Sequence, residues 1–339
     1  MLNRESKRET TDCFAASEFD HRVQFYRDGR VPFVYSGQYD FAALEGAEVS
    51  YGLDPHKRSR IFERLSASLG VNQDHIFCPE QVRECDLKLV HSRQYLSYVA
   101  SSSLNAAKVM GIKGLEHFSV AELRTRVLRP IWYAVGGTLL ACDLAHYYGW
   151  AINLSGGFHH AAPNKGEGFC FISDIAVAAV KQIRARSGSK VLIVDLDAHQ
   201  GNGLRASLGK VGGISIFDVY NKDVYPRCKE RVNQYDYPLP GTVSDHAYME
   251  LLHSELPKVL DEVEPTLLIY NAGSDVWCED RLGGMQLSRS TVLDRDEFVF
   301  RQGFLRRTPI VMVLAGGYSS HSHELVADSI CNLRFKLMC

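Results

Sequence analysis

The chain of 339 residues is long enough for one large domain or two small ones, and for a sizeable buried core. Apolar residues make up 45% and charged residues 23%, and the formal net charge is -2, so no overall basic field draws the protein to nucleic acid or to an anionic membrane. None of the apolar stretches approaches the length of a membrane span.

Nine cysteines are scattered along the chain without a C-x-x-C pair. An odd number with irregular spacing is typical of reduced thiols in an intracellular protein, not of a disulfide framework or a cysteine-ligated zinc site. The first residues contain Glu5, Glu9 and Asp12 and lack an apolar core, which argues against a signal or transit peptide. We therefore expect a protein of the nucleus, the cytoplasm or both.

The N-terminal region predicts a tail followed by mixed strands and helices. Residues 1–30 are polar and charged with little periodicity, and we interpret them as a flexible tail before a single domain over residues 31–339. Residues 31–35 predict a first strand, and residues 56–69 predict a helix because their apolar side chains recur at helical spacing. A further helix is predicted over residues 130–148.

The second half of the chain alternates between short apolar runs and helical segments. Helices are predicted at residues 172–186, 244–263 and 322–336. The apolar runs, rich in Val, Ile and Leu, lie at residues 150–154, 190–195, 213–217, 266–270 and 309–314. This alternation indicates βαβ units, and continuously apolar strands indicate a sheet covered on both faces. The predicted fold class is α/β, with a parallel sheet sandwiched between helices.

Four of these apolar runs end in a glycine-containing turn that carries a side chain able to bind metal or transfer a proton. Those side chains are His159, His160, Asp197, His199, Asp275 and Tyr318. Each alone is common in a purely structural role, such as a surface loop, a helix N-cap or a core aromatic. In open α/β sheets, however, ligands bind beyond the carboxyl ends of the strands. The coincidence at four strand ends therefore favours a functional site.

Asp197 and His199 are two residues apart, so their side chains point to the same side of an extended or tightly turning segment. With Asp275 they supply one imidazole and two carboxylates. This ligand set suits zinc with one position open for water. The sequence therefore predicts one Zn²⁺ per chain at these three residues.

The motifs at these turns resemble those of zinc-dependent histone deacetylases. The matching segments are Gly156-Gly-Phe-His-His160, Gly168-Phe-Cys170, Asp195-Leu-Asp-Ala-His-Gln-Gly-Asn-Gly203, Asn271-Ala-Gly-Ser-Asp275 and Gly316-Gly-Tyr318. The class IV subgroup is resembled in particular by Ala-His-Gln-Gly-Asn, Asp218-Val-Tyr-Asn221 with Tyr225-Pro226, and Asp280-Arg-Leu-Gly-Gly284. The resemblance runs in order from about residue 31 to the C-terminus. It implies the arginase/deacetylase fold, with a parallel eight-stranded sheet in a catalytic domain.

The resemblance also implies a role for each matched residue. It places the zinc ligands at Asp197, His199 and Asp275. It places catalytic groups at His159, His160, Tyr318, Asp195 and Asn202, with Asp195 orienting the first histidine. It places the substrate tunnel at Gly168, Phe169 and Tyr225. It also implies a monovalent cation, K⁺, held at Asp195, Asp197 and His199 and near Asp218 and Val219.

In the expected reaction His160 takes a proton from water and delivers one to the lysine nitrogen, while Tyr318 donates to the developing oxyanion. Many relatives place a carboxylate where Asn202 stands. A neutral amide can orient the ring but cannot stabilise an imidazolium. We therefore expect the pKa of His160 to lie below that of a histidine paired with aspartate.

The predicted activity is removal of acyl groups from lysine in histones or other proteins, sensitive to hydroxamate-type inhibitors. The class IV resemblance implies a preference for long fatty acyl chains over acetyl. It also implies a part in transcription repression on chromatin within a co-regulator complex.

Other interpretations of the same residues stay open. An acetylpolyamine amidohydrolase uses the same zinc chemistry, and a deacetylase-fold scaffold in a repressor complex would keep the fold without strong catalysis. A binuclear manganese hydrolase of the arginase type is disfavoured, because Gln200 and Asn202 leave too few anionic ligands for two metals. No basic stripe or groove-reading motif predicts direct binding to nucleic acid.

Overall fold

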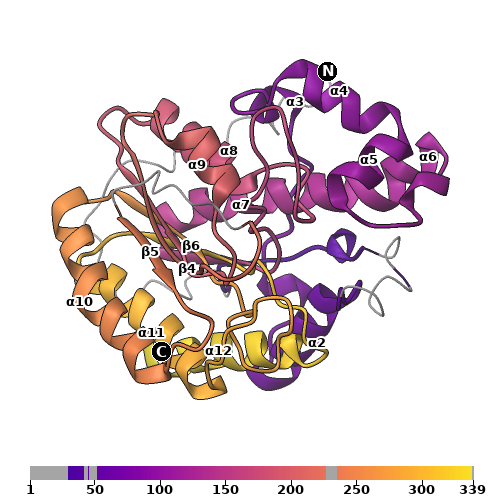
Figure 1. Cartoon of the computed structure of the whole chain (residues 1–339). Coiled ribbons are helices and arrows are strands. Elements are labelled where there is room, and N and C mark those ends of the chain that lie inside the picture. Colours follow the sequence, from indigo (N-terminus) through magenta and orange to yellow (C-terminus); the bar gives the residue numbers. More distant parts are fainter. Residues whose placement is uncertain (1–29, 42–44, 46–51, 227–234, 338–339) are drawn as a thin grey trace, which may run out of the picture.

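The computed structural model describes residues 30–41, 45, 52–226 and 235–337 (Figure 1). The predicted N-terminal tail lies outside these residues except for Arg30, so it stays a prediction. The six cysteines in the described part of the chain are all free thiols, as expected. None of the helices in that part combines the length and the apolar character that a bilayer crossing requires.

The centre of the fold is a parallel sheet with the strand order β1-β2-β7-β6-β3-β4-β5. Its strands are β1 (Phe33–Val34), β2 (Trp150–Asn153), β3 (Val191–Asp195), β4 (Ile214–Asn221), β5 (Tyr235–Leu239), β6 (Leu267–Asn271) and β7 (Ile310–Val313). The strands β2, β3, β6 and β7 are buried throughout, because their apolar side chains face helices on both sides. The predicted α/β fold with a parallel sheet is confirmed.

The sheet has seven strands in the described residues, where the resemblance implied eight. The position beside β1 is occupied by Phe77, which forms a single parallel bridge with Val34. The Phe77 amide donates to the carbonyl of Phe33 at 2.9 Å, and the Tyr35 amide donates to the carbonyl of Phe77 at 3.1 Å. The chain here pairs for too short a distance to form a strand.

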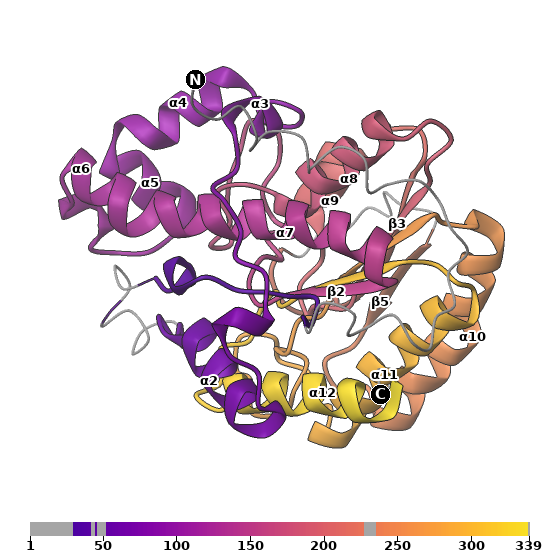
Figure 2. The same ribbon diagram turned by 180° about the vertical axis from the view of Figure 1, so that it is seen from behind.

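Helices cover both faces of the sheet (Figures 1 and 2). One layer consists of α7 (Arg129–Tyr148) and α8 (Asp174–Ala185), with α9 (Asn202–Leu208) packed against α8. The opposite layer consists of α2 (Lys57–Leu69), α10 (Asp245–Val263), α11 (Arg289–Leu305) and α12 (Ser322–Leu337). The predicted helices within these two layers are confirmed to within a few residues.

A group of shorter helices lies beyond the N-terminal end of α7 (Figure 2). It contains α3 (Glu84–Leu87), α4 (Arg93–Ser101), α5 (Ser103–Met110), α6 (Val120–Glu122) and a π-helical segment, Leu123–Leu128, that continues into α7. Short 3₁₀ helices occur at Gly37–Tyr39, Gln73–His75 and Leu115–His117. The sequence patterns did not predict this group, nor did they predict α9, α11 and β5.

Several helices begin at a serine whose hydroxyl oxygen accepts a hydrogen bond from a backbone amide in the first turn. Ser173 caps α8 in this way, Ser244 caps α10 and Ser288 caps α11. Such caps satisfy amide groups that have no partner within the helix and contribute about 1 kcal/mol each. The cap at Ser173 fixes the start of α8 directly behind the loop that carries the histidine pair.

Candidate active site

The loops after four strands meet at one edge of the sheet. The strands β2, β7, β6 and β3 are neighbours in that order and all run in the same direction. Their carboxyl ends therefore lie side by side, although the strands are far apart in the sequence. The loops carry the predicted residues His159, His160, Tyr318, Asp275, Asp197 and His199.

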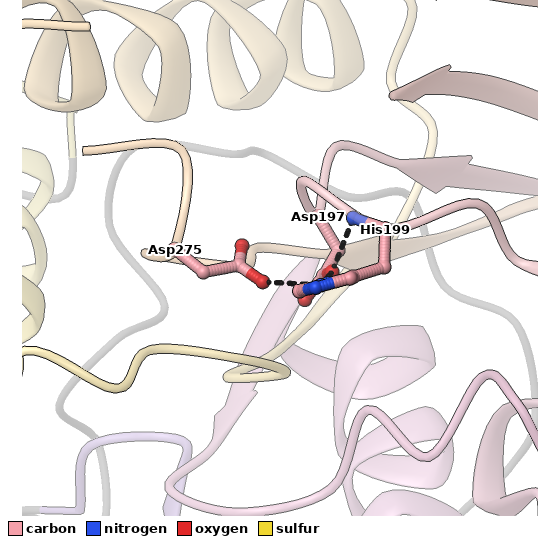
Figure 3. A group of neighbouring side chains, drawn as sticks. All are labelled: Asp197, His199 and Asp275. Atoms are coloured by element: carbon pink, nitrogen blue, oxygen red, sulfur yellow. Dashed lines mark hydrogen bonds and ion pairs between the residues drawn. The ribbon is translucent and has the colours of Figure 1, made fainter. Parts of the chain in front are cut away.

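Asp197, His199 and Asp275 form a buried group of candidate metal ligands (Figure 3). The Nδ1 atom of His199 lies 2.9 Å from Oδ2 of Asp275 and 3.1 Å from Oδ1 of Asp197. All the candidate ligand atoms lie within 4.8 Å of one another. In the part of the chain that the structure describes, this is the one such group of three or more side chains.

Backbone amides hold the two carboxylates in place. The His199 amide donates to Oδ1 of Asp197 at 2.8 Å, and the Ala198 amide donates to Oδ1 of Asp275 at 2.9 Å. The Gly316 amide, from the loop after β7, donates to Oδ2 of Asp197 at 2.8 Å. Three strand-end loops thus fix one ligand set.

The charges of this group fit a bound cation. Burial and the neighbouring carboxylate of Asp197 raise the pKa of Asp275 to about 7. Burial alone would lower the pKa of His199, but hydrogen bonds to Asp197 and Asp275 outweigh burial and raise that pKa to about 11. Two buried carboxylates therefore require positive charge between them. One imidazole and two carboxylates are also a donor set that zinc accepts.

The side chains of the two adjacent histidines contact different partners. The Nδ1 atom of His159 lies 2.9 Å from Oδ2 of Asp195, the residue predicted to orient this ring, and the orienting role itself stays a prediction. The Nδ1 atom of His160 lies 2.7 Å from Oδ1 of Asn202. Both rings are buried, and their centroids are 4.1 Å apart. The side-chain amide of Asn271 donates a hydrogen bond to Oδ1 of Asp195 at 2.8 Å and so helps to hold the carboxylate that faces His159.

Close backbone approach shapes the loop around the histidine pair. A Cβ atom on Gly157 (φ 92°) would lie 2.4 Å from the Cα atom of Ala315, in the loop after β7. A Cβ atom on Gly168 (φ 55°) would lie 2.3 Å from Cδ2 of His160. Both positions therefore require glycine. Phe169 follows with φ 64°, a left-handed conformation that is costly for a non-glycine residue and is typical of functional sites.

Tyr318 lines a cavity of about 80 Å³ together with the histidine pair, Asp197 and Phe169. Its ring centroid lies 6.2 Å from that of His199 and 5.9 Å from that of Phe169. Burial and the nearby carboxylates raise the pKa of Tyr318 well above its ordinary value, so the phenol keeps its proton and can donate it in a hydrogen bond.

The predicted tunnel residues gather at the opening of this site. Gly168, Phe169 and Tyr225 line a second cavity of about 410 Å³, which His160, His199 and Tyr318 also border. The centroid of the Tyr225 ring lies 5.2 Å from that of His160. Tyr225 is 42% exposed, so it forms part of the rim.

Sequence reasoning missed several buried polar residues that hold the site from behind. Asp174, at the start of α8, accepts hydrogen bonds from the Gly157 and Phe158 amides at 3.0 and 2.8 Å. Lys57, on α2, donates to the carbonyl oxygens of Gly316 and Gly317 at 3.2 and 3.4 Å. Both begin a helix and neither follows a strand closely in the sequence, so the patterns at strand ends do not indicate them.

Arg295 lies within a helix, as Asp174 and Lys57 do, whereas Asp280 lies in the loop after β6 and was noted in the sequence only as part of a motif, without a role. Arg295, fully buried on α11, donates from Nη1 to the carbonyl oxygens of Leu196 at 3.0 Å and Gly273 at 2.8 Å. It thereby ties together the two loops that carry the candidate ligands. Asp280 accepts a hydrogen bond from the Tyr318 amide at 2.5 Å and so supports the third loop.

The predicted monovalent-cation residues are also close together. Asp195 and Asp218 are opposite one another on β3 and β4. Burial and the charge of Asp195 raise the pKa of Asp218 to about 7. Oδ1 of Asp218 is buried and has no hydrogen-bond partner within the described residues, which fits a bound cation or water. However, Arg205 Nη2 already lies 2.7 Å from Oδ2 of Asp218 and supplies one positive charge. K⁺ binding stays a prediction.

The sequence is similar to known proteins over most of its length. Residues 52–333 match the family model described as the histone deacetylase domain. Histone deacetylase 2 of Arabidopsis thaliana is 36% identical over 307 residues, which cover 90% of this chain and 79% of that protein. An uncharacterized protein of Picosynechococcus sp. is 32% identical over 274 residues, covering 80% and 88%. Histone deacetylase 1 of Homo sapiens is 23% identical over 314 residues, covering 88% and 61%. The matched region contains all the strand-end loops described above.

Proposed function

The chain belongs to the histone deacetylase family, and from this premise we propose that it is a zinc-dependent hydrolase that removes acyl groups from lysine side chains of proteins. The observation that carries the proposal is the convergence of two histidines and Tyr318 on the cavity next to the buried ligand group. The proposed domain over residues 31–339 contains all of these residues.

Asp197, His199 and Asp275 would hold the zinc ion, which when bound polarises the acyl carbonyl group and lowers the pKa of water. His160 has its Nδ1 atom on Asn202, so its Nε2 atom is available to take a proton from water and to return one to the lysine nitrogen. His159, paired with Asp195, keeps positive charge beside the reacting carbonyl group.

Tyr318 would donate its phenolic hydrogen to the oxygen on which negative charge develops. A hydrogen bond of this kind is strongest where water is excluded, and the Tyr318 side chain lines the cavity beside the two histidines. Phe169, Gly168 and Tyr225 would surround the lysine side chain and keep bulk water out.

The acyl group is the finer part of the proposal. We propose that long acyl chains are better substrates than acetyl, in line with membership of class IV. Support comes from Phe41, Leu53, Met110 and Phe158, which give the cavity apolar walls. The cavity volume of about 80 Å³ accommodates only the first carbons of such a chain, so its remainder would require these walls to move apart.

We propose class IV membership from the sequence segments that resemble this subgroup, one of which contains Asn202, an amide in contact with His160 at a position where many relatives have a carboxylate. We propose with it a role in transcription repression on chromatin, a co-regulator complex, and residence in the nucleus or cytoplasm. Fluorescent tagging and affinity purification from the native cell test these points. Binding to a membrane or directly to nucleic acid would contradict them.

The decisive experiment compares acetyl-, octanoyl- and myristoyl-lysine peptides with acetylpolyamines, using purified zinc-loaded protein. Hydrolysis of the peptides and inhibition by a hydroxamate would support a protein deacylase. Equal or better turnover of acetyl-lysine would remove the long-chain preference. Better turnover of acetylpolyamines would support the alternative amidohydrolase. Absence of both bound zinc and inhibition would support a scaffold.

A further inference from the structure

Asn202 has a second contact, on the side away from His160. Its Nδ2 atom donates a hydrogen bond to Oε1 of Glu167 at 2.8 Å, while its Oδ1 atom lies 2.7 Å from Nδ1 of His160. One amide therefore joins a carboxylate to the ring that would act as the base. Glu167 was not among the residues that the sequence pointed to.

Glu167 is held in this position from several sides. Its Oε2 atom accepts a hydrogen bond from Lys165 at 2.6 Å, and its backbone carbonyl oxygen accepts one from the Cys170 amide at 2.9 Å. Burial tends to raise the pKa of Glu167, but hydrogen bonds from Lys165, Tyr225 and Asn202 outweigh it and lower that pKa below its ordinary value. The side chain is therefore an ionised carboxylate, which can only accept hydrogen bonds.

The direction of these hydrogen bonds has a chemical consequence. Because the Glu167 carboxylate cannot donate, the amide NH₂ group of Asn202 must face it. The amide oxygen of Asn202 then faces His160, and a carbonyl oxygen can only accept. The hydrogen in that contact must come from Nδ1 of His160, so the neutral ring has its lone pair on Nε2.

We propose that Glu167 is a positioning residue for the hydrolysis. Through Asn202 it sets the tautomer of His160 in which Nδ1 carries the hydrogen and Nε2 is free to take a proton. The carboxylate that many relatives place next to this histidine is here moved one amide further away. This inference rests on the proposed function for its kinetic consequence, but not for the tautomer itself.

A double-mutant cycle tests the kinetic consequence. Glu167→Ala leaves Tyr225 as a partner of the Asn202 amide, and because a phenol hydroxyl can donate as well as accept, the amide can then turn over. We therefore expect kcat to fall about tenfold while KM changes little. In an Asn202→Asp background, the same Glu167→Ala change removes a like charge that faces the new carboxylate, so kcat should stay equal or rise. Glu255→Ala, which breaks an exposed ion pair with Lys258, is the control and should not change kcat. An equal fall of kcat in both backgrounds, or no fall in the native one, would overturn the proposal.

The tautomer can be measured independently of turnover. In the zinc-loaded full chain with ¹⁵N-labelled histidine, NMR should show a hydrogen on Nδ1 of His160 and a bare Nε2. Glu167→Ala should produce a mixture of the two tautomers, whereas Glu255→Ala should not. An unchanged tautomer in Glu167→Ala would refute the role of Glu167. A wild-type chain that hydrolyses no acyl-lysine peptide would contradict the proposed function, yet this spectrum would still decide the inference.

Discussion

The rings of His159 and His160 lie 4.1 Å apart, yet their pKa values move in opposite directions. Burial alone would lower both. At His159 the charges of Asp195 and Asp197 outweigh burial and raise the pKa to about 9. At His160 burial and the charge of His159 lower the pKa well below its ordinary value, in spite of the hydrogen bond to Asn202. In the metal-free site these charges favour a cation at the first ring and a neutral base at the second.

This contrast predicts the effect of Asn202→Asp. A carboxylate at 202 would favour the imidazolium form of His160 and raise its pKa by about one unit or more. Because the base must be neutral to act, the acidic limb of the profile of kcat/KM against pH should move to higher pH. Measuring that profile for the variant and the native chain checks the prediction. An acidic limb that does not move would contradict it.

Tyr318→Phe removes the phenolic hydrogen while keeping the ring that packs near Phe169. If the phenol donates to the developing oxyanion, kcat should fall on the order of 10²–10³-fold with little change in KM. Steady-state kinetics measure the effect. Zinc content and the melting temperature should equal those of the native chain, and an unchanged kcat would remove Tyr318 from the chemistry.

Removal of zinc should destabilise the fold. Without zinc, only the imidazole of His199, whose pKa is raised to about 11, offsets the repulsion between the buried carboxylates of Asp197 and Asp275, and the raised pKa of Asp275 shows that this repulsion remains. Free zinc at 100 times its Kd should stabilise the native chain by about 2.7 kcal/mol. Calorimetry with zinc and with chelator measures the shift in melting temperature. Asp275→Asn should reduce the shift, whereas Asp261→Asn, at an exposed ion pair with Arg306, should leave it unchanged. A zinc-independent melting temperature in the native chain would be inconsistent with the site.

Arg295→Met should weaken both stability and metal binding. The change deletes the hydrogen bonds to the carbonyl oxygens of Leu196 and Gly273 and leaves Asp296 without its buried cation. We expect a loss of about 3–5 kcal/mol in the free energy of unfolding and a zinc affinity lower by about 10–100-fold.

Arg301→Met is the matched control, because Arg301 lies on the same helix but is exposed and forms an ion pair with Glu297 at the surface. Urea unfolding and competition with a zinc chelator give the two quantities. If Arg295→Met lost stability but bound zinc as tightly as Arg301→Met, Arg295 would be structural only.

His91 should make the fold sensitive to mild acid. Its Nδ1 atom lies 3.1 Å from the carbonyl oxygen of Ala162, and its Nε2 atom accepts a hydrogen bond from the Ser173 amide at 3.0 Å. Burial lowers the pKa of His91 from 6.5 to about 4, and a second ring hydrogen would also face an amide donor.

The unfolded chain binds this proton at a higher pH than the native chain does. Stability from His91 is therefore fully present above pH 6.5 and is lost as the pH falls towards 4, by about 2 kcal/mol at pH 5. Urea unfolding at pH 7.5 and pH 5 measures the loss. His91→Gln should reduce it, whereas His117→Gln, at an exposed ring, should not. An equal loss of stability in the native chain, His91→Gln and His117→Gln would argue against this role of His91.

The sequence predicted the parts of the fold where apolar side chains repeat regularly. The strands β2, β3, β6 and β7 are short apolar runs buried on both faces, and a short run of this kind between turn residues is typical of a central parallel strand. Helix α11 escaped detection because its buried side includes Arg295 and Asp296, so no apolar stripe marks it. Strand β5 escaped detection because its five residues include Asp236 and Pro238.

The residues of the candidate site likewise divide into those that a local sequence pattern indicates and those that it does not. Residues that act at strand ends stand next to glycines and could be found from local patterns. The supporting roles of Glu167, in the same loop as the histidine pair, and of Arg295, on α11, depend instead on contacts across large sequence separations. Nothing in the sequence near Arg295 indicates that its side chain reaches the carbonyl oxygen of Leu196, 99 residues away.

The place of β7 in the sheet also bears on how the protein is made. This strand, Ile310–Val313, follows the other described strands in the sequence, yet it lies between β2 and β6. A nascent chain that ends before β7 has its histidine loop and its metal-ligand loops but lacks the strand that joins them in register. Until β7 is made, the strands on its two sides have unpaired inner edges, which favour wrong pairing and aggregation. The same strand therefore completes both the sheet and the catalytic centre.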